Sequence, residues 1–101
     1  VDAKDKAGRT PLQSAAGKGW SKALVGLLLA KGADVNSRDK TGLSPLHGAV
    51  QLGNEDIVEL LIAKGADVNA MNKAGVTPLF LAEKERNSKM IDLLKKHGAV
   101  R

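Results

Sequence analysis

The sequence contains no cysteine and no tyrosine, and Trp20 and Phe80 are its only aromatic residues. Without cysteine, the chain can form neither a disulfide bond nor a thiolate site for metal or redox chemistry. With so few aromatic rings, the core has to consist of leucine, valine, isoleucine and alanine. The hydrophobic content of 43% and the charged content of 27% are those of a globular protein, so we expect no extensive disorder.

Membrane and secretion signals are also missing. No apolar run approaches the length that spans a bilayer, no N-x-S/T glycosylation site is present, and the opening residues are not a signal peptide. We therefore expect a soluble intracellular protein, in the cytoplasm or the nucleus, with no membrane partner. Val1 in place of methionine indicates a trimmed or excised segment. The net charge of +5 makes acidic partners worth considering.

The sequence does contain an internal repeat. The hexapeptide KGADVN occurs at residues 31–36 and again at 64–69. Pro11, Pro45 and Pro78 are spaced by 34 and 33 residues and stand in similar frames, Thr-Pro-Leu or Ser-Pro-Leu. A period of this length is typical of stacked repeat proteins. We expect a single repeat domain over residues 1–101, divided into unit 1 (1–34), unit 2 (35–67) and unit 3 (68–101).

Each unit has the pattern of a polar turn followed by two helices. Thr10, Ser44 and Thr77 are typical N-cap residues, and the proline after each of them suits the first helical position. Glycines near the helix ends permit the left-handed conformation that reverses the chain. The predicted first helices are 12–18, 46–52 and 79–85, and the predicted second helices are 23–30, 57–63 and 89–96.

The second helices carry apolar residues at matching positions in all three units. Residues 24–28 also satisfy the L-x-x-L-L pattern of helical docking peptides. Residues 57–61 hold the equivalent positions in unit 2, and stacked helices would bury both sets. We therefore expect these residues to form core rather than a docking motif.

These features resemble the ankyrin repeats. The family's TPLHLAA motif appears as TPLQSAA at 10–16, SPLHGAV at 44–50 and TPLFLAE at 77–83, and its LLLxxGADVN motif appears at 27–36 and 60–69. The resemblance implies an all-α ankyrin-repeat solenoid of three helix-turn-helix units stacked side by side, with the turns projecting as β-hairpin-like fingers. It also implies protein recognition on the concave face, which the fingers and the first helices form.

The two end units depart from the family pattern. Unit 1 has one extra residue between Gly19 and Leu24, so we expect its inter-helix loop to bulge. Unit 3 lacks the inner glycine and has charged residues at 95–97, which suits a C-terminal cap that faces water. Unit 1 is as apolar as an internal unit. We expect that the chain was excised from a longer array whose preceding repeat covered unit 1; the alternative is that another surface covers it.

No pattern indicates catalysis, a cofactor or a metal site. The Gly-Lys pair at 17–18 lacks the glycine at position 12 and the hydroxyl at position 19 that a phosphate-binding loop requires. His47 and His97 have no cysteine or second imidazole nearby in sequence, so we assign them structural or solvent-facing roles. The resemblance implies that the side chain of His47 makes structural hydrogen bonds. We expect no enzymatic activity, no cofactor and no small-molecule substrate.

Trp20 stands beside the inserted residue of unit 1, where the family usually has histidine. We expect its ring to pack over the first loop and to be buried. The alternative is an exposed ring that binds a partner, because tryptophan is enriched at interaction hot spots.

The candidate contact surface follows from the stacking. Residues one period apart become neighbours, about 8–10 Å from each other, so Lys6, Lys40 and Lys73 should form one ladder. The surface should be basic in unit 1 and more apolar in unit 3, and we expect a protein partner, with an acidic one favoured. The candidate contact residues are Lys4, Lys6, Arg9, Lys18, Arg38, Lys40, Leu43, Leu52, Met71, Lys73 and Val76.

Other functions remain open at this point. Nucleic acid or another polyanion is the alternative partner for a basic surface. Asp5 and Asp39 interrupt the lysine ladder and no aromatic residue lies in it, so nucleic acid is not the partner that we expect. A third possibility is a purely architectural segment of a longer ankyrin array. A further possibility is that the chain is a synthetic or selected binder. The irregular first loop argues against this origin.

Overall fold

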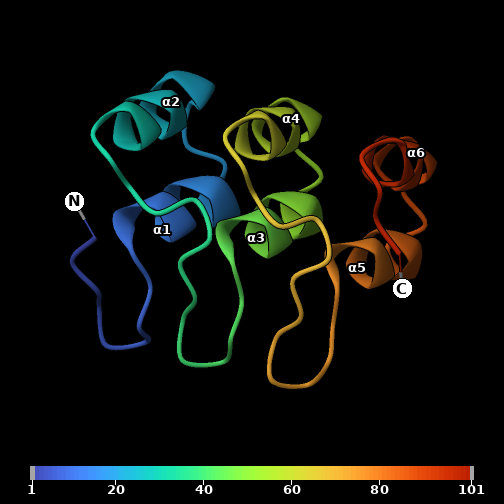
Figure 1. Cartoon of the computed structure of the whole chain (residues 1–101), viewed down its shortest axis with the longest axis horizontal. Helices are drawn as coiled ribbons and strands as arrows, with labels where there is room; N and C mark the ends of the chain where they lie inside the picture. The colour runs from blue at the N-terminus through green and yellow to red at the C-terminus, as the bar shows by residue number, and fades with distance from the viewer. Residues whose placement is uncertain (1, 101) are drawn as a thin grey trace.

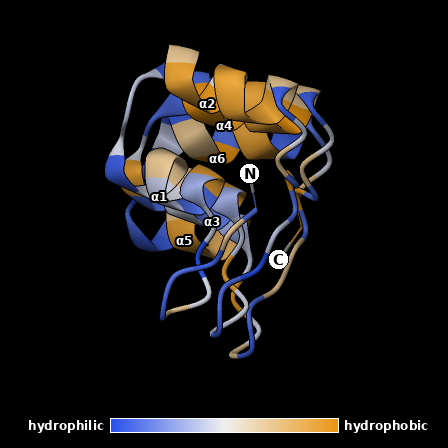
Figure 2. Ribbon diagram, turned by 90° about the vertical axis from the view of Figure 1, so that its left-hand side faces the viewer, coloured by the Kyte–Doolittle hydropathy of each residue, from blue (hydrophilic) through white to orange (hydrophobic). Residues whose placement is uncertain are grey.

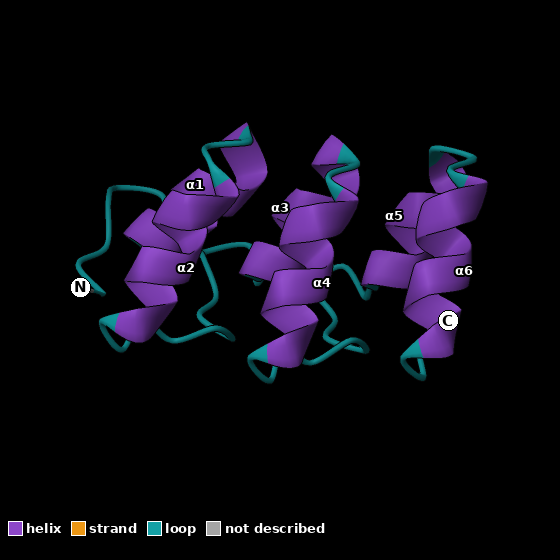
Figure 3. Ribbon diagram, turned by 90° about the horizontal axis from the view of Figure 1, so that it is seen from above, coloured by secondary structure: helices purple, strands orange, loops and turns teal. Residues whose placement is uncertain are grey.

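The computed structural model describes residues 2–100, which form six helices and no strand. The first helices of the three units lie in one row and the second helices in another (Figures 1 and 3). Helix α1 packs on α3 and α3 on α5, and each of them also packs on the second helix of its own unit. The first row is α1 (Pro11–Lys18), α3 (Pro45–Leu52) and α5 (Pro78–Lys84), and the second row is α2 (Lys22–Ala30), α4 (Glu55–Ala63) and α6 (Ser88–Lys96).

Three polar turns extend from the first row, away from the second row (Figure 1). We name residues 3–9, 37–43 and 70–76 the finger turns. Each is closed by a backbone hydrogen bond, as in finger turn 2, where the N–H of Asp39 donates to the carbonyl of Leu43 at 3.0 Å. The expected β-hairpin-like fingers thus appear within the described residues as turns without strands.

The predicted N-caps of the first helices are confirmed. Thr10, Ser44 and Thr77 each accept the backbone N–H of the residue three positions later, and each helix begins at the following proline. This start is one residue earlier than predicted, because proline itself takes the first helical position. The second helices also begin one or two residues earlier than predicted, since each has its own polar cap. These caps are Ser21, Asn54 and Asn87.

The chain reverses between the two helices of each unit through a left-handed residue. Gly19 and Gly53 take this conformation with φ of 72° and 83°. Unit 3 has no glycine there, and Arg86 adopts φ of 54° instead. A side chain at such a φ costs about 1–2 kcal/mol, so the loop of unit 3 is locally strained.

The extra residue of unit 1 lengthens its inter-helix loop, as predicted. Residues 19–21 separate α1 from α2, whereas only residues 53 and 54 separate α3 from α4. The prediction that Trp20 is buried is wrong, because 44% of the residue is exposed. Its ring borders a hollow beside Pro11 and Ser14 at the N-terminal end of the stack, where no described residue closes over it.

The core lies between the two rows and between neighbouring units. Leu12, Leu46 and Leu79 occupy equivalent positions in the first helices and are at most 3% exposed. The second helices contribute side chains that are completely buried, and these are Val25, Ile57, Val58, Leu61, Met90 and Leu94.

The core prediction is wrong for one residue of the L-x-x-L-L segment. Leu27 is 53% exposed, whereas the equivalent Leu93 is only 9% exposed. The equivalent Leu60 is partly buried and lies against Gly26 of the preceding unit. Leu27 has no such neighbour among the described residues, which explains its exposure. Within residues 2–100, every helix is too short or too polar to cross a membrane.

Candidate protein-interaction surface

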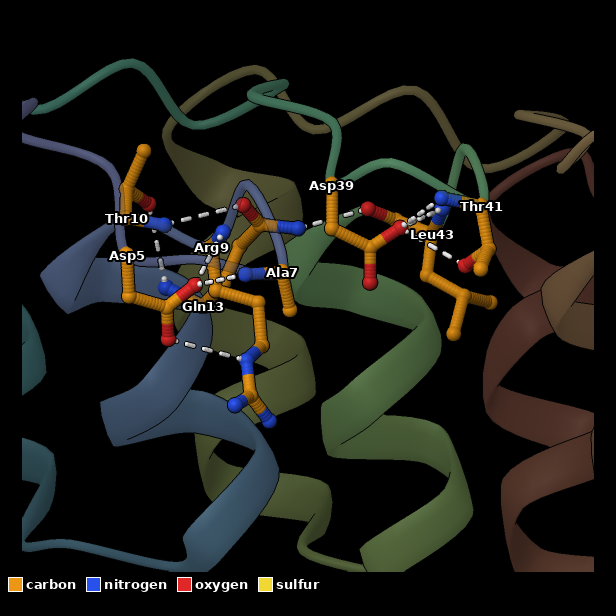
Figure 4. A network of polar contacts seen from close by, with 8 residues as sticks. All are labelled: Asp5, Ala7, Arg9, Thr10, Gln13, Asp39, Thr41 and Leu43. Atoms are coloured by element: carbon orange, nitrogen blue, oxygen red, sulfur yellow. Dashed lines mark hydrogen bonds and ion pairs between the residues drawn. The ribbon is translucent and has the colours of Figure 1, made fainter.

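An acidic or amide side chain organises each finger turn, and Figure 4 shows the first two of these turns. Oδ1 of Asp5 accepts the backbone N–H groups of Ala7 and Arg9, both at 2.9 Å. Oδ1 of Asp39 accepts the N–H groups of Thr41 and Leu43, again at 2.9 Å, and the Thr41 hydroxyl at 2.7 Å. In finger turn 3 the same role falls to a neutral residue, Asn72, which accepts the N–H groups of residues 74 and 76.

These hydrogen bonds shift the titration of both aspartates. The N–H of Arg9 is the largest influence on Asp5 and lowers its pKa below the ordinary 3.8. Burial alone would raise the pKa of Asp39, but the Thr41 hydroxyl and the N–H groups of Leu43 and Thr41 outweigh it, so the pKa is lowered as well. Both carboxylates are therefore ionised at neutral pH, and their charge serves the turns that contain them.

The lysine ladder (Lys6, Lys40 and Lys73) has the predicted alignment. The N–H of Lys40 donates to the carbonyl of Ala7 at 2.9 Å, and the N–H of Lys73 donates to the carbonyl of Thr41 at the same distance. Neighbouring finger turns are thus joined through their backbones. All three lysine side chains are exposed, and none forms an ion pair with an acidic side chain in the described part of the chain.

Two other predicted cations bridge neighbouring turns. Nζ of Lys4 lies 3.5 Å from the carbonyl of Arg38, and Nη1 of Arg38 donates to the carbonyl of Met71 at 2.8 Å. These three residues are equivalent in the repeat, so the contacts confirm that they align. Arg38 and Lys4 remain exposed, and Met71 is 58% exposed. The sequence had not indicated that these cations hold the fingers together.

In the column of Arg9, Leu43 and Val76, only the first residue is fully exposed. Arg9 is exposed, and its Nε forms an ion pair with Oδ2 of Asp5 at 3.2 Å. This contact leaves the two terminal nitrogens of the guanidinium group without a described partner (Figure 4). Leu43 and Val76 are only partly exposed, and Val76 packs against the core. A partner would therefore contact Leu43 and Val76 only at the rim of the surface.

Lys18 and Leu52 lie at the far ends of α1 and α3 and are both exposed. A Cβ atom on Gly19 would come within 2.9 Å of Cδ2 of Leu52, so the leucine reaches across to the loop of unit 1. The two side chains border an open hollow whose other wall is the start of α4, with Glu55 and Asp56. Lys18 thus places a positive charge beside a hollow whose other wall carries the acidic residues Glu55 and Asp56.

A narrow groove between α1 and α3 was not predicted. It has a volume of about 170 Å³. The helices approach closely there, since a Cβ atom on Gly48 would lie 3.0 Å from Cα of Gly17. The two glycines on facing first helices were the available signal for this approach. The groove is lined by Arg9, Gln13, Ser14, Gly17, Lys18, Asp39, Leu43, Ser44 and Gly48.

His47 is completely buried and links unit 2 to unit 3, which confirms its structural role. Its Nδ1 accepts the N–H of Ser44 at 3.1 Å, so Nε2 carries the proton and donates to the carbonyl of Val76 at 2.8 Å. Burial lowers the pKa of His47, and the hydrogen bond to Val76 offsets part of this effect. Gln13 makes the same link one unit earlier, with its Nε2 at 2.6 Å from the carbonyl of Leu43.

His97 is exposed at the end of α6. No group of three or more histidine, aspartate and glutamate side chains in residues 2–100 is placed to hold a metal ion.

Comparison with known proteins identifies the repeat. A family model described as ankyrin repeats in three copies matches residues 1–72 and 22–101. A segment of 51 residues is 45% identical to mouse protein phosphatase 1 regulatory subunit 12A, and one of 50 residues is 46% identical to E3 ubiquitin-protein ligase XBAT33 of Arabidopsis thaliana. Each match covers 50% of this chain but only 5% and 10% of those proteins, so the chain corresponds to a small part of either relative. The chain belongs to the ankyrin-repeat family.

Proposed function

We propose that this chain is a non-catalytic protein-interaction module. Its contact face consists of the finger turns and the first helices α1, α3 and α5, and its partner is a protein with an acidic surface. Ankyrin repeats are generally protein-interaction modules, and the mouse relative is named as a regulatory subunit of a phosphatase. A regulatory subunit works by binding another protein, which is consistent with this proposal.

The concentration of charge on the finger turns carries the proposal. They contain six lysine or arginine residues and two aspartates, so they hold +4 of the formal net charge of +5. Both aspartates bind backbone N–H groups inside their own turns. Neighbouring ladder lysines lie about one Debye length apart, so their fields add at physiological salt. An acidic protein surface would be attracted to this side of the molecule.

The fingers are also held in place before any partner binds. The backbone bonds between neighbouring turns and the Lys4 and Arg38 bridges restrict their movement. The fingers therefore lose little conformational entropy when a partner binds them. The proposed contact residues are those of the original set, with Leu43 and Val76 at the rim: Lys4, Lys6, Arg9, Lys18, Arg38, Lys40, Leu43, Leu52, Met71, Lys73 and Val76.

A pair of charge-matched variants tests the proposal. The finger variant replaces the lysine ladder with glutamate. Each version of the chain captures proteins from a cell lysate, and mass spectrometry identifies them. We expect the original chain and the control to capture the same proteins and the finger variant to lose them; capture of the same set by all three would contradict the proposal. The control variant replaces three exposed lysines of the second row with glutamate, and these are Lys22, Lys64 and Lys89.

Polyanion binding is the second candidate. The six cations of the finger turns lie on the same side of the molecule, and both aspartates accept backbone N–H groups within their own turns. Polyanion binding differs from protein recognition in its dependence on salt. Binding that accepts any polyanion, heparin included, and falls linearly on a logarithmic salt scale would favour it. A specific protein contact would withstand moderate salt and heparin. If no version of the chain binds anything, the purely architectural role is favoured.

A further inference from the structure

The groove between α1 and α3 lies where two glycines face each other. Gly17 and Gly48 both line it, and neither has a side chain that could fill it. The next units carry larger residues at the equivalent positions, Gln51 in place of Gly17 and Leu81 in place of Gly48. Leu81 is only 8% exposed, so its side chain packs into the fold. The contact between α3 and α5 therefore lacks the pair of glycines that opens this groove.

Packing does not require a glycine at position 17. A Cβ atom there would meet nothing closer than Cα of Gly48 at 3.8 Å, which is an ordinary contact. Position 17 is helical, and alanine and glutamine both favour a helix more than glycine does. The reverse holds at Gly48, whose Cβ atom would lie 3.0 Å from Cα of Gly17. Gly17 therefore weakens the helix without improving the packing, and what it provides is room in the groove.

Two cations line the groove. Arg9 precedes α1 and Lys18 is the last residue of this helix, so a positive charge lies toward each end of it. Nε of Arg9 binds Asp5, but its two terminal nitrogens have no partner in the described chain, and Lys18 forms no ion pair there. Ser14, which stands between the two cations in the sequence, also lines the groove. Figure 2 shows α1 mostly in pale and blue colours, in contrast to the orange α2, so the groove borders a polar helix.

The nearby acidic residues are engaged by their own turns. Asp39 lines the groove, and its Oδ1 accepts three hydrogen bonds inside finger turn 2. Asp5 is not a lining residue, and it accepts two N–H groups of finger turn 1. The lining residues therefore carry two positive charges and one negative charge, a formal net charge of +1. An anionic group is attracted to the groove, and a cationic group is repelled from it.

The groove has room for one side chain. Its volume of about 170 Å³ equals that of about six water molecules in the liquid. A glutamate side chain needs about the same space, whereas a segment of peptide backbone with its side chains needs far more. A partner therefore fills the groove with a single residue.

We infer that this groove is a pocket for one carboxylate side chain, a glutamate or an aspartate that projects from an acidic segment of a partner protein. The two terminal nitrogens of Arg9 can donate to a carboxylate, and Lys18 adds a second positive charge. The Ser14 hydroxyl can donate a further hydrogen bond. The pocket lies on the proposed contact face, so its role rests on the proposed function and adds one specific position to a face that otherwise selects partners by overall charge.

Short random peptides displayed on phage are the probe for this pocket. Selection on the original chain yields binders, and each acidic residue of a binder is then changed in turn to its amide, glutamate to glutamine and aspartate to asparagine. The affinity of each peptide is measured for the original chain and for Gly17→Gln. This variant introduces the residue that unit 2 already carries as Gln51, so it should close the groove without straining the helix.

One acidic position of the binder should be coupled to the groove. Changing it to the amide should weaken binding to the original chain at least about tenfold, because a charge-assisted pair is lost. The same change should have little effect on Gly17→Gln, which itself should bind the acidic peptide at least about tenfold more weakly. Its stability in urea should be unchanged or slightly higher. Gly26→Ala is the matched control, since it replaces a helical glycine away from the groove and should leave the affinity unchanged.

The two cations should act on the same position of the peptide. Arg9→Gln and Lys18→Gln should each weaken binding about two- to fivefold and reduce the effect of the amide change. Lys22→Gln removes the same charge from the second row and should leave both quantities unchanged. In nuclear magnetic resonance spectra, the backbone amide signals of Gly17 and Gly48 should shift with the acidic peptide and stay in place with its amide version.

Several results would overturn the pocket. Binding that depends on the lysine ladder but is indifferent to Gly17→Gln would exclude the pocket and leave the proposed function standing. A coupled position with a basic or apolar residue would show that the groove does not recognise a carboxylate. A large loss of stability in Gly17→Gln would show that position 17 serves packing. If no selected peptide distinguishes the original chain from the finger variant, both the pocket and the proposed function are wrong.

Discussion

Replacing His47 tests how the units are coupled. His47→Ala removes the donor to the carbonyl of Val76 and the acceptor for the N–H of Ser44, both of which belong to a buried site. His47→Gln should keep both contacts, because Gln13 makes the equivalent pair in unit 1, accepting the N–H of Thr10 at 3.1 Å and donating to the next unit. Comparing the two variants therefore separates the effect of losing the bond between units 2 and 3 from the effect of replacing the imidazole ring.

The expected losses can be estimated from these contacts. Losing the hydrogen bond to Val76 costs about 1 kcal/mol, and leaving the buried N–H of Ser44 unpaired costs about 1–3 kcal/mol more. The void left by the imidazole ring adds to this, so we expect His47→Ala to lower the free energy of unfolding by about 3–5 kcal/mol. His47→Gln should change it by less than about 1.5 kcal/mol.

The dependence on pH gives a sharper test. Because burial lowers the pKa of His47 below 6.5 in the folded chain, the unfolded chain binds this proton more readily. The resulting stability is fully present above about pH 6.5 and is lost as pH falls from there toward the folded pKa, with a slope of up to about 1.4 kcal/mol per pH unit. A proton on Nδ1 would also face the N–H of Ser44, so the bond from this N–H in the capping box of α3 would be lost.

Urea unfolding followed by circular dichroism, from about pH 8 to about pH 5, measures this effect. The difference in free energy of unfolding between the original chain and His47→Gln should shrink or reverse as pH falls. His97→Gln is the control, since His97 is exposed and should leave the profile of the original chain unchanged. Parallel profiles for the original chain and His47→Gln would refute the assignment of a neutral, buried His47.

Three further predictions concern the backbone and are measured by urea unfolding. Gly48→Ala should cost about 1–3 kcal/mol, because its Cβ atom would lie 3.0 Å from Cα of Gly17, whereas Gly26→Ala meets nothing closer than 3.9 Å and should be neutral or slightly stabilising. Arg86→Gly should stabilise the chain by about 1 kcal/mol by relieving its positive φ of 54°; destabilisation would show that the arginine side chain outweighs the strain. Asp39→Ala should cost about 1–3 kcal/mol, since Oδ1 accepts three hydrogen bonds in finger turn 2, and Asp39→Asn should recover most of the loss.

Much of the fold could be predicted because its determinants are local. The N-cap residue and the proline after it define the start of each first helix within one residue, and the glycines Gly19 and Gly53 mark the turns between helices. The period of the repeat then places equivalent residues side by side. This reasoning was sufficient to align Lys6 with Lys40, and Lys4 with Arg38.

The errors arise where a residue depends on its neighbour in space. Leu27 has the same pattern as Leu60 and Leu93, and only the absence of a described unit before it leaves it exposed. Trp20 lies in the loop that carries the inserted residue of unit 1, so no equivalent residue could indicate its direction. The bridging role of Arg38 depends on the reach of a flexible side chain, which spacing alone does not specify.

The finger aspartates show how structure and recognition are combined in one turn. A turn of this shape needs a side-chain oxygen that accepts two backbone N–H groups, and Asp39 and Asn72 meet this need equally well. The choice between them changes the net charge of the finger without changing its backbone hydrogen bonds. Asp39→Asn and Asn72→Asp therefore shift the charge of the contact face in opposite directions while the turns stay formed. If the face selects acidic partners by charge, the first change should strengthen binding and the second should weaken it.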